Sequence, residues 1–480
     1  MLLTCLSAVL PGCTPSVTRG ARAPVATLVQ TIDRLLADST LAGAGSAILV
    51  VSLDRGDTLY ASETNRLYTP ASNRKLFVAA SALHYLGPDF RFRTPLIATA
   101  GLTGDTLNGD LALVGRGDPD LTTAGLGALA DSVVSHGIRV VAGNIMVDDG
   151  YFDDVEWGSG WMWDDGPYWY WPYINALTIN DNTVSVEIVP GGQVGEPVEV
   201  QIDPPTAYVE LNVDAVTSSL NAESTLEVER HWTPKENVID VTGSLPAESE
   251  PVVAVRSIEE PALYAGTLLA ELLEARGVEL LGTVQRGAIA EAATDTIAVH
   301  VSEPLSVSVE NLLKVSDNLT AEQLVKVVGA EISGPPGTYE SGLAAEHLFL
   351  ANKVGIDTLA LRLADGSGVS RYNLVTAGQI VRLLVHMAGR GDIGKPFLAA
   401  LPIAGVDGTL EERMVDTAAA NVARAKTGSL AGVSSLSGYV PSANGERLAF
   451  SILMEFFVGP TAPRRAIQDS IIVTLAEFAR

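Results

Sequence analysis

The sequence predicts a multidomain α/β protein in which helices pack around an antiparallel sheet and a β-rich region interrupts this sandwich. At 480 residues the chain exceeds one ordinary hydrophobic core, so two or three domains are expected. Both ends of the chain combine helical and strand patterns. Residues 90–300 instead consist mainly of short Val-, Ile- and Thr-rich runs separated by Gly, Pro and Asp. One or two accessory domains are therefore expected between the two parts of the sandwich.

The N-terminal part has the pattern of a helix, two strands and a second helix. Apolar residues recur at helical spacing from Leu28 to Leu36, and two apolar strands follow at 47–53 and 58–61. The second helix is expected to begin just after Pro70, with Ser72 in its first turn, and to stop at residues 87–88.

The C-terminal part returns to helical periodicity from Pro304 onward. It ends with a hairpin that turns at Asn444-Gly445, a strand over 448–456 and a final helix that carries Ile467 and Leu475 on its apolar face. Together with the N-terminal elements, these complete the expected sandwich.

The net charge of −26 argues against nucleic acid and anionic membrane surfaces as partners. Residues 1–23 are expected to be a leader and linker, in which Leu10-Pro11-Gly12-Cys13 resembles a lipobox. No Lys or Arg precedes the apolar stretch and Pro11 is unusual there, so an arbitrary apolar leader is the alternative. An export signal predicts a periplasmic, cell-envelope or extracellular location, with membrane contact only through a lipid on Cys13. The other cysteine, Cys5, also lies here, so the rest of the chain has no disulfide.

Three short motifs carry the candidate chemistry. Ser72-Asn73-Arg74-Lys75 is the only Ser-x-x-Lys in the chain, and Ser316-Asp317-Asn318 and Lys426-Thr427-Gly428 follow in that order. This trio is the signature of class A β-lactamases and penicillin-binding proteins. Each motif alone is weak, but the ordered set, with the first at a helix start and the last entering a hairpin, is a strong signal.

The chemistry of the first motif follows from helix geometry. Positions i and i+3 share a face, so the Lys75 amine is expected to reach the Ser72 hydroxyl. A serine needs a neighbouring base to become a nucleophile, and a desolvated lysine serves when its pKa falls enough to leave it neutral. The helix N-terminus would favour the developing anion.

Each motif also has a purely structural interpretation. Ser72 is also typical of a helix N-terminus, and Ser316 and Asn318 are typical helix-capping residues. Lys426-Thr427-Gly428 is equally compatible with a strand edge that carries a solvated lysine. The scarcity of lysine in the chain makes the accidental occurrence of both lysine motifs improbable.

The sequence resembles the class C low-molecular-mass penicillin-binding proteins, of the penicillin-binding protein 4 type. These are D-alanyl-D-alanine carboxypeptidases/endopeptidases. The resemblance runs from about Val25 to the C-terminus and includes the three motifs, Asn180-Asp181-Asn182 and Asp365-Gly366-Ser367-Gly368. It implies a transpeptidase-like (β-lactamase-like) catalytic domain with two inserted β-rich accessory domains. The expected ranges are 24–92 and 300–480 for the catalytic domain, 93–120 and 205–299 for accessory domain II, and 121–204 for accessory domain III.

The resemblance implies a role for each motif residue. Ser72 would be acylated, Lys75 would be its base, Ser316 would relay a proton to the leaving amine, and Asn318 would hold the substrate amide. Lys426 and Thr427 would bind the terminal carboxylate of D-Ala, and Gly428 and Ser429 would continue that substrate-binding strand. The backbone N–H groups of Ser72 and Ser429 would form the oxyanion hole.

A further substrate contact is implied for the aromatic segment 157–173. Asp165 would take the free amine of the stem peptide's diamino acid, with Tyr170 and Arg371 lining the same pocket. Packing at a domain interface is the alternative for Trp161 and Trp163. No metal or cofactor is implied, and β-lactams are expected as covalent inhibitors. A serine β-lactamase and a non-catalytic cell-wall-binding scaffold remain as alternatives, although no Glu-x-x-Leu-Asn motif follows Ser316 at the usual β-lactamase distance.

Overall fold

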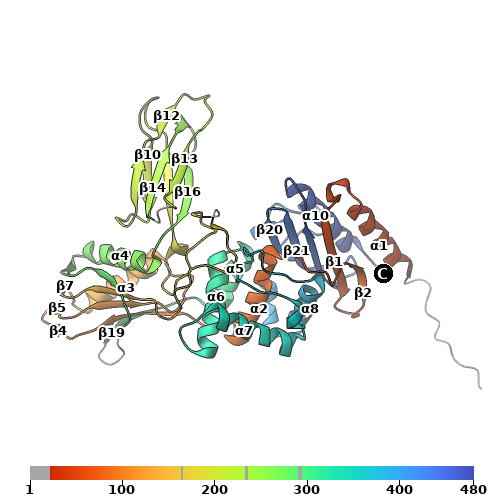
Figure 1. The fold of residues 1–480 in the computed structure, drawn as a ribbon, viewed down its shortest axis with the longest axis horizontal. Coiled ribbons are helices and arrows are strands. Elements are labelled where there is room, and N and C mark those ends of the chain that lie inside the picture. Colours follow the sequence, from red (N-terminus) through yellow and green to blue (C-terminus); the bar gives the residue numbers. More distant parts are fainter. Residues whose placement is uncertain (1–21, 164–165, 233–235, 290–294) are drawn as a thin grey trace, which may run out of the picture.

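The computed structural model describes residues 22–163, 166–232, 236–289 and 295–480. Figure 1 shows an elongated molecule with a helix–sheet sandwich at one end and the inserted region at the other. A narrow lobe of strands projects from the inserted region. Both the start of α1 and the C-terminus lie at the outer side of the sandwich.

The sandwich is built on an antiparallel sheet with strand order β2-β1-β22-β21-β20. The predicted hairpin is confirmed, and its second strand pairs along its whole length with β1, so that Gly45 faces Glu455. This pairing joins the two ends of the chain into one domain. The strands are β1 (Gly45–Ser52), β2 (Thr58–Ser62), β20 (Arg424–Leu430), β21 (Val433–Pro441) and β22 (Arg447–Glu455).

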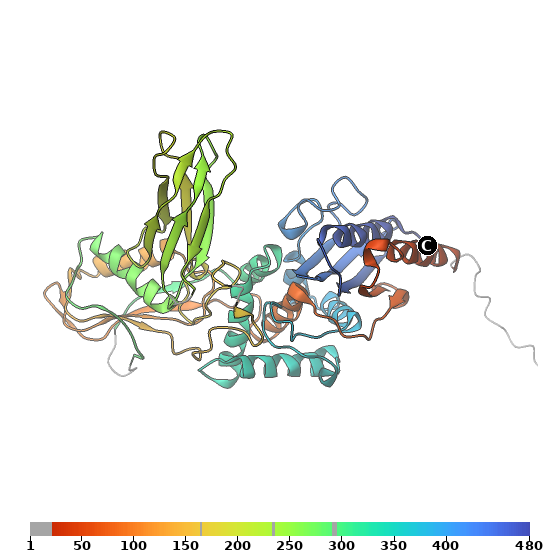
Figure 2. The same ribbon diagram turned by 45° about the horizontal axis from the view of Figure 1, so that its top comes forward.

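Helices cover both faces of this sheet, as expected for a sandwich. The first and last helices, α1 and α10, pack side by side on one face, as Figure 2 shows beside the C-terminus. On the other face α8 lies against β1 and β22 and leads into the helical layer that contains α2. The helices of this domain are α1 (Arg22–Leu36), α2 (Lys75–Tyr85), α5 (Leu305–Lys314), α6 (Asn318–Ser333), α7 (Tyr339–Phe349), α8 (Ala377–Ala388), α9 (Gly394–Ala399) and α10 (Ala462–Glu477).

Helix α2 is the central element of the helical layer. Residues 75–83 are all buried, because the helix packs against α5, α6 and α7 on different sides. A helix that is apolar all round is buried all round, which explains the unbroken run of small and apolar residues. The predicted start after Pro70 is confirmed, with a 3-10 turn, η3 (Ala71–Arg74), ahead of the α-helix.

The inserted region forms two groups of strands. The first contains a mixed sheet of order β18-β8-β6-β3-β19, a small sheet of order β17-β7-β5-β4 and the helices α3 and α4. These elements are β3 (Arg93–Ala98), β4 (Leu102–Thr103), β5 (Thr106–Leu107), β6 (Leu111–Val114), β7 (Val140–Val141), β8 (Ile145–Asp148), β17 (Glu279–Leu280), β18 (Val284–Arg286), β19 (Asp295–Val301), α3 (Thr123–Ser135) and α4 (Pro261–Glu274).

The second group is the projecting lobe of Figure 1. Strand β9 is the centre of its first sheet, in the order β10-β9-β16, and two short sheets of order β11-β14-β13 and β12-β15 complete it. The strands are β9 (Thr183–Val189), β10 (Glu199–Asp203), β11 (Glu210–Val213), β12 (Val216–Ser218), β13 (Glu227–Arg230), β14 (Val238–Thr242), β15 (Ser244–Pro246) and β16 (Val252–Ser257).

The strand pairing contradicts the expected boundaries within the insertion. Strand β8, which the 121–204 unit would contain, pairs with β6 and β18 of the other group, and β9 pairs with β16. The parallel β6–β8 and β8–β18 pairs need crossover connections, and α3 and α4 lie between the paired strands in sequence. Both helices fall in the region that was expected to be mainly β.

Within the described ranges, no helix combines the length and the apolar character that a membrane crossing requires.

A buried ion pair fastens the start of α2 to α7 and generates a stability prediction. Arg74 donates from Nη1 and Nη2 to Glu346 Oε1 and Oε2, both at 2.6 Å, and the two side chains are 0% and 3% exposed. Removing one partner of a buried pair costs about 3–5 kcal/mol. Glu346→Ala should therefore lower the urea midpoint of unfolding clearly. Asp131→Ala, which breaks an exposed pair with Arg276, should change stability by at most about 1 kcal/mol. Equal effects of the two substitutions would contradict this assignment.

Candidate active site

The predicted contact between Ser72 and Lys75 is present in the structure. The Lys75 Nζ atom lies 3.0 Å from Ser72 Oγ, across one turn of helix. It also donates to Asn318 Oδ1 at 2.6 Å and to the carbonyl oxygen of Ser367 at 2.8 Å. Three acceptors from three separate segments therefore fix the amine beside the serine hydroxyl.

Burial controls the charge of this amine. Lys75 is fully buried, and desolvation lowers its pKa from about 10.5 to about 8. The carboxylates of Asp317, Glu322 and Asp365 act in the opposite direction, and the Arg74 guanidinium acts with burial. Because desolvation is the largest effect, the neutral amine is accessible near neutral pH.

The second motif occupies the short connection between α5 and α6. Ser316 adopts a left-handed backbone with φ of 67°, and Asp317 caps α6 by accepting hydrogen bonds from the N–H groups of Leu319 and Thr320. Asn318 accepts from Lys75 and donates from Nδ2 to the carbonyl oxygen of Tyr170 at 2.8 Å. Asp317 caps the helix, so the capping interpretation is wrong for Ser316 and Asn318, the two residues to which it was applied.

The third motif lies on β20, the edge strand that packs against η3. Asn73 Nδ2 donates to the carbonyl oxygen of Lys426 at 3.0 Å, which ties the strand to the Ser72 turn. Lys426 is fully buried, with its Nζ donating to the Thr427 carbonyl oxygen at 3.0 Å. Burial, with the neighbouring charge of Lys75, lowers the pKa of Lys426. The interpretation of a solvated lysine at a strand edge is therefore wrong.

Close approach of β20 to the Ser72 turn requires a glycine at position 428. A Cβ atom there would lie 2.2 Å from Ser435 Oγ, 2.8 Å from the Pro70 oxygen and 2.9 Å from the Ser72 nitrogen. Ser429, the next residue, is exposed. The backbone of β20 at Gly428 therefore lies next to the backbone N–H of Ser72.

One buried acid of the site, Glu322, was not singled out from the sequence. Glu322 accepts hydrogen bonds from the backbone N–H groups of Gly366 and Ser367 at 2.7 and 2.6 Å. Its pKa is raised to about 7 by burial and, second, by the charge of Asp365. It therefore positions the loop whose Ser367 carbonyl accepts from Lys75. The available signal was the spacing of Glu322, one helical turn after Asn318, which places both on one face of α6.

The structure describes two of the three residues that were predicted to form the amine pocket. Tyr170 is 38% exposed and stacks on Tyr168 with ring centroids 5.5 Å apart. Arg371 is exposed and donates from Nη2 to the carbonyl oxygen of Ala431 at 2.6 Å, on the turn that follows β20. The predicted Asp165 lies outside the described residues.

The two tryptophans of this segment differ in their environments. Trp161 donates from Nε1 to Asp365 Oδ2 at 3.0 Å and packs on Trp171, so it joins the inserted region to the catalytic loop. Trp163 is 77% exposed. The interface-packing interpretation therefore holds for Trp161 and not for Trp163.

The family model described as the D-Ala-D-Ala carboxypeptidase 3 (S13) family matches residues 28–478. The chain belongs to this family. It is 41% identical over 485 residues to the D-alanyl-D-alanine carboxypeptidase of Actinomadura sp. (strain R39), over 98% of this chain and 88% of that protein. It is 30% identical to the D-alanyl-D-alanine carboxypeptidase DacB of Haemophilus influenzae, over 79% of each chain.

A solved structure of similar fold agrees with the sequence relatives. The crystal structure of penicillin binding protein 4 (dacB) from Haemophilus influenzae superposes with a TM-score of 0.82 and 26% identity, covering 93% of this chain and 99% of that chain. These findings confirm the predicted fold and the serine-type D-alanyl-D-alanine carboxypeptidase activity. The β-lactamase and scaffold alternatives are correspondingly disfavoured for this S13 carboxypeptidase.

The Gly428 contacts generate a prediction for this carboxypeptidase. Gly428→Ala should push β20 away from η3, and a displacement of about 1 Å in an active site is able to cost about 10²-fold in rate. We expect kcat/KM to fall by at least about tenfold, with little change in the far-ultraviolet spectrum. The control is Gly101→Ala, where a new Cβ meets no heavy atom within 4 Å. Unchanged kinetics of Gly428→Ala would contradict the close approach.

Proposed function

We propose that this carboxypeptidase hydrolyses the terminal D-Ala-D-Ala bond of peptidoglycan stem peptides through an acyl-Ser72 intermediate. The observation that carries the proposal is the buried Lys75 amine held 3.0 Å from Ser72 Oγ. The same chemistry applies to D-Ala–diamino acid cross-links. β-Lactams would acylate the same serine, in line with the similar Haemophilus influenzae penicillin binding protein 4 structure described as complexed with a novel β-lactam.

Acylation would begin with proton transfer from Ser72 Oγ to neutral Lys75 Nζ. The oxygen then attacks the carbonyl carbon of the penultimate D-Ala, and the tetrahedral oxyanion forms beside the N–H groups of Ser72 and Ser429. Collapse breaks the C–N bond, and protonated Lys75 passes its proton through Ser316 to the amine of the departing D-Ala. Lys75, neutral again, would then take a proton from a water molecule whose oxygen attacks the ester carbonyl. Collapse breaks the bond to Ser72 Oγ, and Lys75 returns the proton to that oxygen.

The third motif would recognise the terminal carboxylate of the substrate. Lys426 and Thr427 would bind this group, and Asn318 would hold the substrate amide. Lys426 is buried beside Lys75, and burial together with the Lys75 charge lowers the pKa of Lys426. An arriving carboxylate would favour the charged form of Lys426, which is the form that binds it.

The stem-peptide side chain would lie toward the inserted segment. Asp165 would pair with the free amine of the diamino acid, with Tyr170 and Arg371 as neighbours. Lys75 and Tyr170 are linked through Asn318, which hydrogen-bonds to both, and this supports a substrate path between them. A periplasmic or cell-envelope location fits such a substrate, and we include in the proposal a lipid anchor on Cys13.

Covalent labelling tests the proposal directly. Benzylpenicillin should add one adduct per chain, and peptide mapping should place it on Ser72, because this hydroxyl contacts the buried amine. Ser72→Ala should give no adduct, whereas Ser81→Ala, on the following helix α2, should label like the wild type. An adduct that persists in Ser72→Ala would refute the assignment.

The pH dependence of acylation tests the role of Lys75. If neutral Lys75 is the base, kcat/KM should rise with pH and reach half its plateau near the pKa of about 8. Glu322 has a pKa of about 7 and is therefore largely ionised where Lys75 titrates, so its charge favours protonated Lys75.

Glu322→Gln removes that charge and should move the half-maximal pH to a lower value. It should also reduce the plateau by roughly 10-fold or more, because a glutamine oxygen replaces only one of the two acceptors that hold the Ser367 loop. The exposed Glu340→Gln serves as control. An unshifted profile in Glu322→Gln would exclude this electrostatic link.

A further inference from the structure

A cavity of about 390 Å³ lies between the sheet and the helices α8 and α9. It is formed by the ends of β1, β21 and β22, the start of β20 and the turn between the two helices. None of its lining residues belongs to the three catalytic motifs. Its volume lies within the range of about 300–1,000 Å³ that is typical of small-molecule sites.

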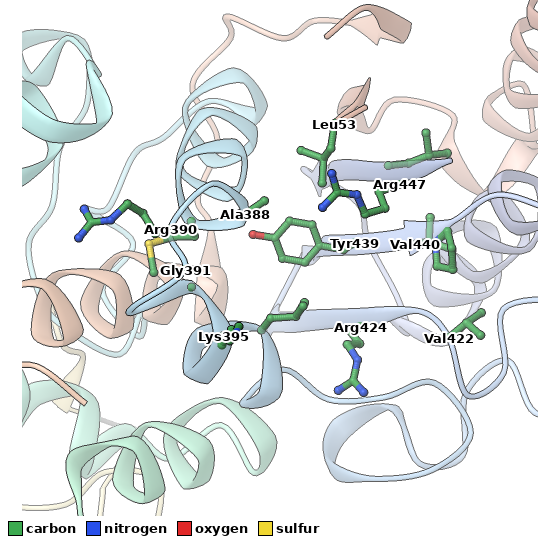
Figure 3. A pocket seen from close by; sticks show the side chains of 15 residues that line it. Leu53, Ala388, Arg390, Gly391, Lys395, Val422, Arg424, Tyr439, Val440 and Arg447 are labelled. Carbon is green, nitrogen blue, oxygen red and sulfur yellow. The ribbon is translucent and has the colours of Figure 1, made fainter. Parts of the chain in front are cut away.

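Four basic residues, Arg390, Lys395, Arg424 and Arg447, line this cavity, although the whole chain has a net charge of −26. Figure 3 shows the Tyr439 ring at the centre, with Arg447 on one side and Arg424 on the other. Lys395 projects from the neighbouring helix α9.

Two of these cations have no protein counter-charge within the described part of the chain. Arg447 is already held by Asp54 at 2.7 Å. Arg424 and Lys395 form no ion pair or side-chain hydrogen bond with any described residue. A guanidinium presents a planar fork of donors that matches a carboxylate or phosphate bidentately.

The remaining walls are apolar. Leu53, Leu398 and Val422 line the cavity, and the last two are each 40% exposed. The Tyr439 hydroxyl donates to the carbonyl oxygen of Leu384 at 2.8 Å, so the ring presents its apolar face to the space. A ligand that fills the cavity needs an apolar body next to its charge.

We propose that this cavity is a second binding site, separate from the catalytic centre, for an organic anion with an apolar body. Arg424 binds the carboxylate or phosphate bidentately, Lys395 adds a second contact, and the apolar walls hold the body. The basic side chains repel a ligand that carries a positive charge. An inorganic anion has no apolar body that could contact the walls.

Calorimetric titration of the full chain with three probes tests the site. 4-Phenylbutanoate supplies both features, 4-phenylbutylamine carries the same body with a positive charge, and inorganic phosphate carries charge alone. Only 4-phenylbutanoate should bind measurably. Equal affinity for phosphate, or for the amine, would overturn the proposal.

Matched arginine variants locate the probe. Arg424→Gln should lower the affinity for 4-phenylbutanoate by at least about tenfold, since hydrogen bonds to charged groups are among the stronger ones. Lys395→Gln should lower this affinity less. Arg390→Gln is the control, because Arg390 is paired with Asp392 and points away from Tyr439 in Figure 3.

The same affinity in Arg424→Gln as in the wild type would place the probe elsewhere and refute the site. If that variant unfolds, Val422→Asp takes its place, because a carboxylate on the exposed apolar wall should abolish binding of the anion. Retained binding in Val422→Asp would refute the site equally.

Discussion

The contact between a fully buried lysine amine and a serine hydroxyl is the constraint on which the rest of this structure depends. An ammonium group buried without partners is costly, so the amine needs acceptors, and yet it must lose its proton to act as a base. The fold meets both requirements by surrounding Lys75 with three neutral acceptors and keeping the nearest carboxylates occupied elsewhere. Asp317 caps a helix and Glu322 holds a loop, so neither forms an ion pair with the amine.

This arrangement requires segments that are distant in sequence. The serine turn, the connection before α6, the 365–368 loop and β20 all meet at Lys75 or next to it, and the sheet pairing of β1 with β22 holds the two halves of the chain together. Two strained backbone positions lie here, because Ala71 and Ser316 both have positive φ values. Strained residues of this kind persist only where the surroundings fix them, which is typical of functional sites.

The sequence predicted those structural features that depend on the local order of residues. Alternating and helical periodicity predicted the flanking strands and helices, and i, i+3 spacing predicted the Ser72–Lys75 contact. The sequence did not predict which strands of the insertion pair with one another, because nothing within these short Val-rich strands indicates their partners. Strand β8 was therefore assigned to the wrong group, and the crossover helices α3 and α4 were missed. Glu322 was missed for a related reason, since its importance depends on a loop that lies 44 residues away.

The charge state of Lys75 is the most direct test of this account. Lysine-specific ¹³C labelling, with the Lys75 resonance identified by its loss in Lys75→Ala, would report the titration of this amine by nuclear magnetic resonance. The account predicts a midpoint near pH 8, well below the ordinary lysine value of about 10.4. A midpoint for Lys75 above pH 10, like that of an ordinary lysine, would contradict the claim that burial prepares it to accept the proton of Ser72.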